Sequence, residues 1–488
     1  MNKTVETFTL LDIEDIKLFV GGEWVSASSN GSFSLQNPST GEIVATIPRG
    51  GKTEARNAIE AADRAFSSWS KLTANNRAGY LLKLRDLMLD NEEELAAIMS
   101  MEMGKAYTEA VGEVTYAANF LSWYAEEGRR VYGETIPASA PNKRLTVIKQ
   151  PVGVIAAITP WNFPLAMMTR KLGPALAAGC TGVVKPASQS PLSALAFAKL
   201  AEKAGIPKGV VNVVAGATEE ISNEIFDNPI VKKVSFTGST EVGRTLVEKS
   251  APQLKKLSLE LGGHAPFIVF EDADLEKAAE GAVASKFRNA GQTCICANRI
   301  YVHENVKDDF AKLFVEKVKA LKVGNSLDST VQIGPLVNEG GLQKVVEHVE
   351  DAKQKGAVVL QGGNKQETEK GYFFEPTVLE NAHKDMLIMR EETFGPVAPI
   401  TTFSNDEEVI LEANDTEYGL AAYLYTSNIQ RAVNISESLN FGVIGLNDAM
   451  PGVPQAPFGG MNHSGYGREG GHQGIRDYLE EKFISLGL

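Results

Sequence analysis

From residue 151 onward, short segments rich in Val, Ile and Ala alternate with segments of helical pattern, and this alternation restricts the possible folds more than any other feature. Strands that alternate with helices predict a parallel α/β sheet, because each strand needs a crossover to return in the same direction. The strand-like segments cover residues 152–158, 182–185, 211–216 and 232–238, with helical segments over 163–179, 192–204 and 219–227. The rhythm restarts later and predicts a second α/β domain beginning near residue 261. Its strand-like segments cover residues 266–270, 300–302, 398–403 and 422–425.

The part of the chain before residue 151 has other patterns. Residues 18–47 alternate short apolar pieces with turn residues and predict a small antiparallel meander. Residues 53–130 carry apolar residues at helical spacing and predict three or more amphipathic packing helices. Residues 131–150 place a Pro-containing turn between two strand-like pieces, which predicts a projecting hairpin.

Length and composition exclude several classes of protein. A chain of 488 residues is too long for one hydrophobic core and predicts two or three domains. Its net charge of −13 argues against nucleic-acid partners and against adhesion to an anionic membrane. No apolar run approaches a membrane span, and the N-terminus lacks the basic region of a signal peptide. Three cysteines make no disulfide framework, so we expect a reducing, cytoplasmic location.

Residues 258–302 combine the residue types of thiol chemistry in one segment. Glu260 precedes a Gly-Gly turn, and Cys294 follows the tripeptide Gly-Gln-Thr after an apolar run and a helix. A strand, a helix and a return fit between the two side chains, so they can meet. Taken singly, Cys294 would be an inert buried thiol and Glu260 a solvated loop residue. The alternative is a thiol that attacks a carbonyl and a carboxylate that activates water.

The whole segment resembles the aldehyde dehydrogenase superfamily, which carries a Glu-Leu-Gly-Gly segment and then a Gly-Gln-x-Cys segment in this order. The resemblance implies an α/β fold with two Rossmann-like parallel-sheet domains and a small β element that joins subunits into a homodimer or homotetramer. It implies a dinucleotide-binding domain over residues 1–125 and 150–260 and a catalytic domain over 261–460. The oligomerisation element covers residues 126–149 and 470–488, where the C-terminal tail pairs with the hairpin.

The resemblance also implies an oxidation in steps. Cys294 adds to the aldehyde, and the side chain of Asn162 with the backbone N–H of Cys294 stabilises the resulting oxyanion. Hydride then passes to a nicotinamide, and Glu260 activates the water that hydrolyses the thioester. Judged alone, Asn162 would be a turn former.

The dinucleotide site rests on weaker signals, because no G-x-G-x-x-G fingerprint follows a strand. Gly238 and Ser239 lie between a strand and a helix, where free backbone N–H groups can hold a phosphate. Lys185 ends another strand, and the resemblance puts it over the adenosine ribose. Many NAD-preferring members have Glu three residues after this Lys, where Ser188 here is small and neutral. Lys185 and Ser188 could therefore accept the 2′-phosphate, so NADP is favoured over NAD.

Glu392 and Phe394 lie in a Glu-Thr-Phe-Gly-Pro segment that resembles the family's Glu-x-Phe-Gly-Pro segment. By that match Glu392 bonds the nicotinamide ribose and Phe394 lines the nicotinamide, with Trp161 as a further cofactor contact. Without the match, Glu392 would be a turn residue.

Within the family, the chain resembles the succinate-semialdehyde dehydrogenases most closely, from about residue 18 onward. In that group two arginines bind the distal carboxylate, and they correspond to Arg170 and Arg288; surface arginines are the alternative. The group usually has a Ser in the loop before Pro-Phe-Gly-Gly, but residues 451–455 contain no hydroxyl. His264 also stands where Asn or Lys is commoner.

Cys296 lies two residues beyond Cys294. A C-x-C spacing is too tight for the common zinc sites and has no partner pair, so no metal is expected. Cys296 is either a packed thiol or a resolving partner that forms a reversible disulfide with Cys294.

The sequence therefore predicts an NAD(P)-dependent aldehyde dehydrogenase that oxidises a small aldehyde with a distal carboxylate, succinate semialdehyde. A dehydrogenase for glutarate semialdehyde or for broad aliphatic aldehydes, and a catalytically silent protein of the same fold, are the alternatives. A coenzyme-A-acylating enzyme is disfavoured, because Glu260 provides for hydrolysis.

Overall fold

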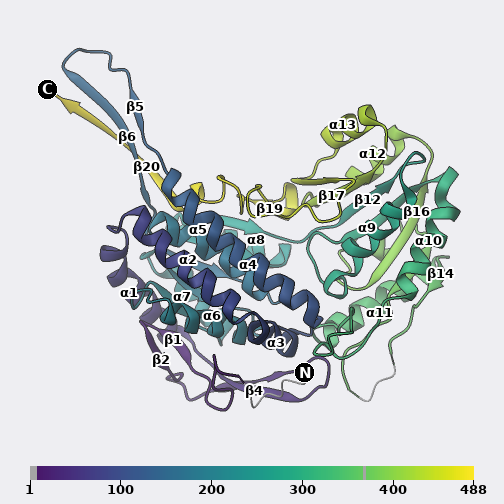
Figure 1. Cartoon of the computed structure of the whole chain (residues 1–488), viewed down its shortest axis with the longest axis horizontal. Helices are drawn as coiled ribbons and strands as arrows, with labels where there is room; N and C mark the ends of the chain where they lie inside the picture. Colours follow the sequence, from purple (N-terminus) through teal and green to yellow (C-terminus); the bar gives the residue numbers. More distant parts are fainter. Residues whose placement is uncertain (1–7, 367–369) are drawn as a thin grey trace.

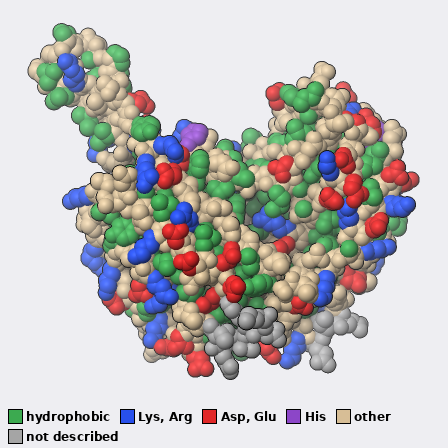
Figure 2. Space-filling view, viewed as in Figure 1, with side chains coloured by type: hydrophobic (Ala, Val, Ile, Leu, Met, Phe, Trp, Pro, Cys, Tyr) green, Lys and Arg blue, Asp and Glu red, His purple; other side chains and the backbone are tan. Residues whose placement is uncertain are grey.

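The structure is a computed structural model and describes residues 8–366 and 370–488. The backbone forms a horseshoe of two lobes, with a ribbon projecting beside the first lobe at the upper left (Figure 1). Figure 2 shows a broad hollow between the lobes on this face. No helix in the described part of the chain is long and apolar enough to cross a membrane.

The first lobe is built on a mixed sheet. Its strands are β1 Leu18–Val20, β2 Glu23–Val25, β7 Val154–Ile158, β8 Thr181–Lys185, β9 Val211–Val213, β10 Val231–Thr237, β11 Lys256–Glu260 and β19 Gly465–Tyr466. Within the described residues these eight strands lie in the order β19-β11-β10-β7-β8-β9-β1-β2. The middle five are parallel and largely buried. Their sequences are mainly apolar, which is typical of strands that are covered on both faces. The predicted parallel sheet is confirmed.

Helices cover both faces of this sheet. They are α1 Lys52–Trp69, α2 Ala74–Asp90, α3 Glu92–Met103, α4 Tyr107–Glu127, α5 Pro164–Ala178, α6 Pro191–Lys203, α7 Thr218–Asp227 and α8 Thr240–Ser250. Helix α5 begins at a proline and ends at Gly179, whose φ of 102° suits only glycine, so the sequence sets both of its ends. It packs closely against α4, and this pair carries side chains of the candidate site.

The second lobe holds the other α/β layer. Its strands are β12 Ala265–Val269, β13 Ala297–His303, β14 Val358–Gln361, β15 Thr377–Glu380, β16 Val397–Phe403, β17 Ala421–Tyr425 and β18 Val443–Leu446. Their order in the described chain is β14-β15-β16-β13-β12-β17-β18, parallel except for β14. The helices are α9 Leu275–Phe287, α10 Lys307–Lys319, α11 Glu339–Gln354, α12 Asp406–Asn414 and α13 Ile429–Ser438. The domain boundary near residue 261 stays a prediction, and β19 is a late strand that returns to the first sheet.

The predicted single meander at residues 18–47 is wrong. The first hairpin joins the large sheet, where Phe19 pairs with Val213, whereas β3 Ser32–Gln36 and β4 Ile43–Pro48 form a separate two-stranded sheet. The hairpin covers the edge of the parallel sheet, which would otherwise leave backbone groups unpaired. Local alternation of apolar residues does not reveal which neighbour a strand will have.

The predicted projecting hairpin is confirmed. It consists of β5 Glu134–Ile136 and β6 Lys143–Pro151, and the C-terminal strand β20 Leu479–Gly487 pairs with β6 along its whole length. This ribbon exposes apolar side chains far from either core (Figure 2). They include Ile136, Ile148, Phe483, Ile484 and Leu486. That the ribbon joins subunits of a homodimer or homotetramer stays a prediction.

Candidate active site

Cys294 lies in a tight loop that turns the chain from α9 into β13. The helix ends at Phe287, and the short 3-10 turn η4 Arg288–Gly291 follows it directly. Asn289 and Ala290 take left-handed backbone angles, with φ of 52° and 55°. This kink directs the chain back toward the first lobe, where a Cβ on Gly263 would collide with the carbonyl of Cys294. The Gly-Gly turn after Glu260 thus allows the two segments to touch.

The side chain of Asn162 reaches the same loop from the other lobe. It lies between β7 and α5, and its Nδ2 donates to the carbonyl of Gln292 at 2.9 Å. The backbone carbonyl of Asn162 accepts from Nζ of Lys105 at 2.7 Å and from Nδ2 of Asn289 at 3.2 Å. Asn162 is 6% exposed, so these bonds hold its amide next to the thiol segment in a dry environment. The structure therefore brings Asn162 and the Cys294 loop together.

Glu260 lies at the end of β11 and is only 4% exposed. Its Oε2 has no hydrogen-bond partner among the described residues. Burial, together with the charge of Glu469, holds the pKa of Glu260 well above that of an ordinary carboxyl. A buried carboxyl with an uncommitted oxygen and a raised pKa has the properties of a general base.

Glu469 is the ionised neighbour of this group. It pairs with Nζ of Lys171, and its Oε2 lies 2.8 Å from Nε of Arg170. Burial alone would raise the pKa of Glu469, but these two cations lower it below its ordinary value. Two carboxyls with opposite pKa shifts thus lie in one buried cluster, and Glu260 takes up a proton more readily than Glu469.

The thiol itself is protonated in this arrangement. Burial raises the pKa of Cys294 to about 12, and the carboxylates of Glu392 and Glu260 act in the same direction. The thiolate is the nucleophile, so the thiol must lose its proton to react. A nearby carboxylate such as Glu260 is suited to accept it.

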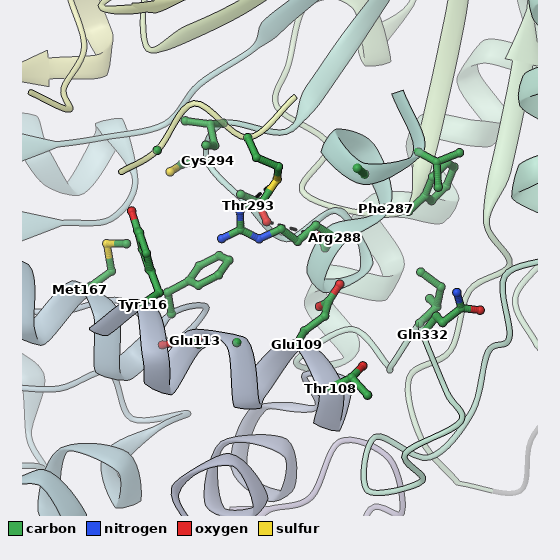
Figure 3. Close-up of a pocket in the computed structure, with 18 of the residues that line it drawn as sticks. Thr108, Glu109, Glu113, Tyr116, Met167, Phe287, Arg288, Thr293, Cys294 and Gln332 are labelled. Atoms are coloured by element: carbon green, nitrogen blue, oxygen red, sulfur yellow. Dashed lines mark hydrogen bonds between the residues drawn. The ribbon is translucent and has the colours of Figure 1, made fainter. Parts of the chain in front are cut away.

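A cavity of about 520 Å³ opens on one side of Cys294 and extends between α4, α5 and α9 (Figure 3). Both predicted arginines line it. Arg170 is 2% exposed, which excludes the surface alternative, and its guanidinium carbon lies 4.0 Å from the ring centre of Phe458. Arg288 is half-buried, 4.7 Å from the ring centre of Phe163. Apart from two glutamates, the wall is otherwise mainly apolar, and with the two arginines the cavity suits a short carbon chain with one anionic end.

A second cavity of about 230 Å³ lies on the other side of Cys294. The predicted cofactor residues that line it are Trp161, Gly238, Ser239, Glu392 and Phe394. Trp161 and Phe394 meet edge to face with ring centres 5.5 Å apart. Oε1 of Glu392 accepts from the N–H of Gly263 at 3.1 Å, and burial raises the pKa of Glu392 to about 7. The thiol is thus reachable from two cavities, as a reaction between two bound molecules requires.

Lys185 and Ser188 lie at the end of β8 and line neither of these cavities. Lys185 is 6% exposed, forms no side-chain hydrogen bond or ion pair with any described residue, and has its pKa lowered to about 8 by burial. A buried cation without a partner fits a site that binds the ribose or phosphate of a dinucleotide. Ser188 beside it is partly exposed.

Several site residues were not predicted. They are Lys105, Glu109, Glu113, Tyr116, Lys171, Phe458 and Glu469. The only signal was the glycine-rich stretch after residue 445, whose backbone freedom indicates a site or a domain seam. His264 is buried and bonds the carbonyl of Ile388 at 3.1 Å, outside both cavities.

Cys296 is buried and lines neither cavity. Its Sγ donates to the carbonyl of Gly291 at 3.3 Å, and Nζ of Lys286 lies 3.6 Å from it. The three cysteines are free thiols in this structure. A reversible bond between Cys294 and Cys296 stays a prediction. No group of metal-ligating side chains was found among the described residues.

Comparison with known proteins agrees with this geometry. The model of the aldehyde dehydrogenase family matches residues 24–484. The chain is 52% identical to the glutarate-semialdehyde dehydrogenase of Pseudomonas aeruginosa and 52% identical to the NADP(+) succinate-semialdehyde dehydrogenase GabD of Escherichia coli, covering 98% of this chain and 100% of each relative. A crystal structure of succinate-semialdehyde dehydrogenase from Burkholderia pseudomallei superimposes with a TM-score of 0.96 at 51% identity, over 98% of each chain. The chain belongs to the aldehyde dehydrogenase family and is an NAD(P)-dependent aldehyde dehydrogenase.

Proposed function

We propose that this dehydrogenase oxidises an aldehyde with a distal carboxylate, and that succinate semialdehyde is its preferred substrate. The observation that carries the proposal is the pair Arg170 and Arg288 on the wall of the apolar cavity that ends at Cys294. Guanidinium groups bind carboxylates through paired, charge-assisted hydrogen bonds. Because the protein carries a net charge of −13, the anion must be collected by local cations.

The chemical steps follow from the side chains around the thiol. Cys294 attacks the carbonyl carbon after losing its proton, and the developing oxyanion accepts from the amide of Asn162 and the backbone N–H of Cys294. The bound nicotinamide cofactor supplies the hydride acceptor. Glu260 removes a proton from water, which attacks the thioester and releases the acid. The apolar cavity wall keeps other water away from the reactive groups.

Glutarate semialdehyde is the second candidate substrate, one methylene longer. Two relatives with equal identity to this chain carry the two substrate names. The cavity wall includes Gly452, which has no side chain to limit the length of the substrate. The two arginines would serve either compound.

Replacing Arg288 with Ala tests the proposal. The KM for succinate semialdehyde is expected to rise about ten- to a hundredfold, because a charge-assisted hydrogen bond contributes roughly 1.5–3 kcal/mol. Oxidation of butanal, which has the same carbon chain without the carboxylate, should change much less. Steady-state kinetics on both aldehydes give the comparison.

Arg288→Lys is the matched variant, since it keeps the charge without the planar fork, and an intermediate KM is expected. Arg170→Ala should act in the same direction, but it also frees Glu469 from a partner and so affects both substrates. Equal losses on charged and neutral aldehydes in the Arg288 variant would contradict the carboxylate assignment and leave the dehydrogenase assignment intact.

We also propose that NADP is preferred over NAD. Buried Lys185, which has no partner among the described residues, and neutral Ser188 beside it suit a 2′-phosphate. Ser188→Glu is expected to lower the ratio of kcat/KM for NADP to that for NAD by about fivefold or more. Two like charges about 4 Å apart in water repel by about 1 kcal/mol.

Ser188→Gln is the matched control for this substitution, because it adds the same bulk without the charge. Its cofactor ratio should stay close to that of the native protein. An unchanged ratio in the Ser188→Glu variant would mean that this position does not face the 2′-group.

A further inference from the structure

We infer that the hydroxyl of Tyr116 donates to the distal carboxylate of the substrate, as a third group beside Arg170 and Arg288, across an opening left by Gly452. This inference rests on the proposed function and deepens it, since it concerns how the anionic end of the substrate is bound.

Tyr116 is fixed on the wall of the substrate cavity. It projects from α4, and its ring meets that of Phe120 edge to face, with centres 5.1 Å apart. Figure 3 shows its hydroxyl pointing away from the helix, toward the side of the cavity where Cys294 and Arg288 lie. The ring is thus held against a neighbouring ring while Tyr116 lines the substrate cavity.

The hydroxyl is uncommitted. Tyr116 is partly buried, and its hydroxyl forms no hydrogen bond with any of the described residues, so it is free to donate into the cavity. Nη2 of Arg170 is also buried without a hydrogen-bond partner in the described chain. By contrast, the hydroxyl of Thr293 on the same wall already donates to the carbonyl of Arg288 at 3.4 Å. Tyr116 and Arg170 thus present two donors on one wall that can bind an acceptor group of the ligand.

Tyr116 and Arg170 pack against the same aromatic ring. Both contact Phe120, whose ring centre lies 5.4 Å from the guanidinium carbon of Arg170. Burial alone would lower the pKa of Arg170, but nearby carboxylates, including Glu469, raise it above its ordinary value. A carboxylate at this wall would therefore meet a permanent cation and a neutral donor together, which combines charge neutralisation with a directed hydrogen bond.

Gly452 lies next to the hydroxyl of Tyr116 and, having no side chain, leaves space beside it. A Cβ built at Gly452 would lie 3.4 Å from the Tyr116 hydroxyl oxygen, at ordinary contact distance, and the backbone there is outside the left-handed region. A small side chain can therefore be introduced at this position without backbone strain. In the native chain the loop over residues 451–455 offers no hydroxyl, and Tyr116 supplies a neutral donor next to this loop.

Tyr116→Phe tests the inference, because it removes one oxygen and keeps the ring. The KM for succinate semialdehyde should rise about tenfold, as expected for the loss of a hydrogen bond to a charged group, and that for butanal less than threefold. Tyr132→Phe, on an exposed tyrosine outside both cavities, is the matched control and should match the native protein on both substrates. Introducing a hydroxyl at the facing wall in Tyr116→Phe/Gly452→Ser should recover part of the loss.

The outcomes are distinguishable when Arg288→Ala is measured in parallel. If Tyr116→Phe changes neither substrate, or changes both equally, while Arg288→Ala is selective for the carboxylate, the role of Tyr116 is refuted and the proposed substrate class stands. If neither variant discriminates between the two aldehydes, the substrate class itself fails, and the inference fails with it.

Discussion

Replacing Cys294 with Ala is expected to abolish aldehyde oxidation, with a loss of roughly 10⁴–10⁶-fold, the range found when a catalytic nucleophile is removed. Without the thiolate no negatively charged tetrahedral adduct forms, and an uncharged aldehyde does not readily release hydride. The measurement is the rate of reduced-cofactor formation at saturating aldehyde and cofactor. Turnover at the native rate in this variant would contradict the mechanism.

Cys180→Ala is the matched control for the thiol. Cys180 is fully buried, whereas Cys294 is partly exposed, and the Sγ of Cys180 donates to the carbonyl of Tyr478 at 3.4 Å, outside both cavities. This variant should keep its activity, with some loss of stability because a buried group is removed. Thermal unfolding of both variants would show that the loss at Cys294 is chemical rather than structural.

Replacing Glu260 with Gln has the second-largest expected effect. Thioester hydrolysis should slow by about 10²–10⁴-fold, the usual contribution of a general base. Reduced cofactor would then appear in a rapid burst of one equivalent per site, followed by a slow phase. Mass spectrometry of the intact protein should detect the acyl group on Cys294.

The pH dependence of thioester hydrolysis also tests the role of Glu260. Burial and Glu469 raise the pKa of Glu260, and a base acts only when deprotonated. Hydrolysis by the native protein should therefore rise with pH through this raised pKa, at a higher pH than for an ordinary carboxyl, and the Gln variant should lose this dependence. A native rate that is flat from acidic to neutral pH would refute the role of Glu260.

Glu102→Gln is the control for removing a buried carboxyl. Burial raises the pKa of Glu102 to about 8, and the group caps α6 by accepting from the N–H of Leu192 at 2.7 Å, outside both cavities. A Gln can still accept at this position. The variant should keep both the rate of hydrolysis and its pH dependence.

Short-range patterns in the sequence were sufficient for much of the fold. The parallel sheets follow from alternating apolar and helical segments, and the ends of α5 from a proline and a glycine. The segment around Cys294, with Glu260 and Asn162, was recognisable because each motif lies within a few consecutive residues. The register of the projecting ribbon and the place of the first hairpin depend on partners distant in the chain, so local pattern was not enough.

The sequence by itself determined the fold class and indicated the candidate reactive segment, because both depend on neighbouring residues whose spacing matches strands, helices and turns. Only the tertiary structure decided which charges surround the reaction. Lys171 and Glu469 are separated by 298 positions, yet they form a buried pair beside Arg170. Their pairing lowers the pKa of Glu469, while the loss of water raises that of Glu260. Burial and the charges of neighbours set these protonation states, and both come into being only when distant segments pack together.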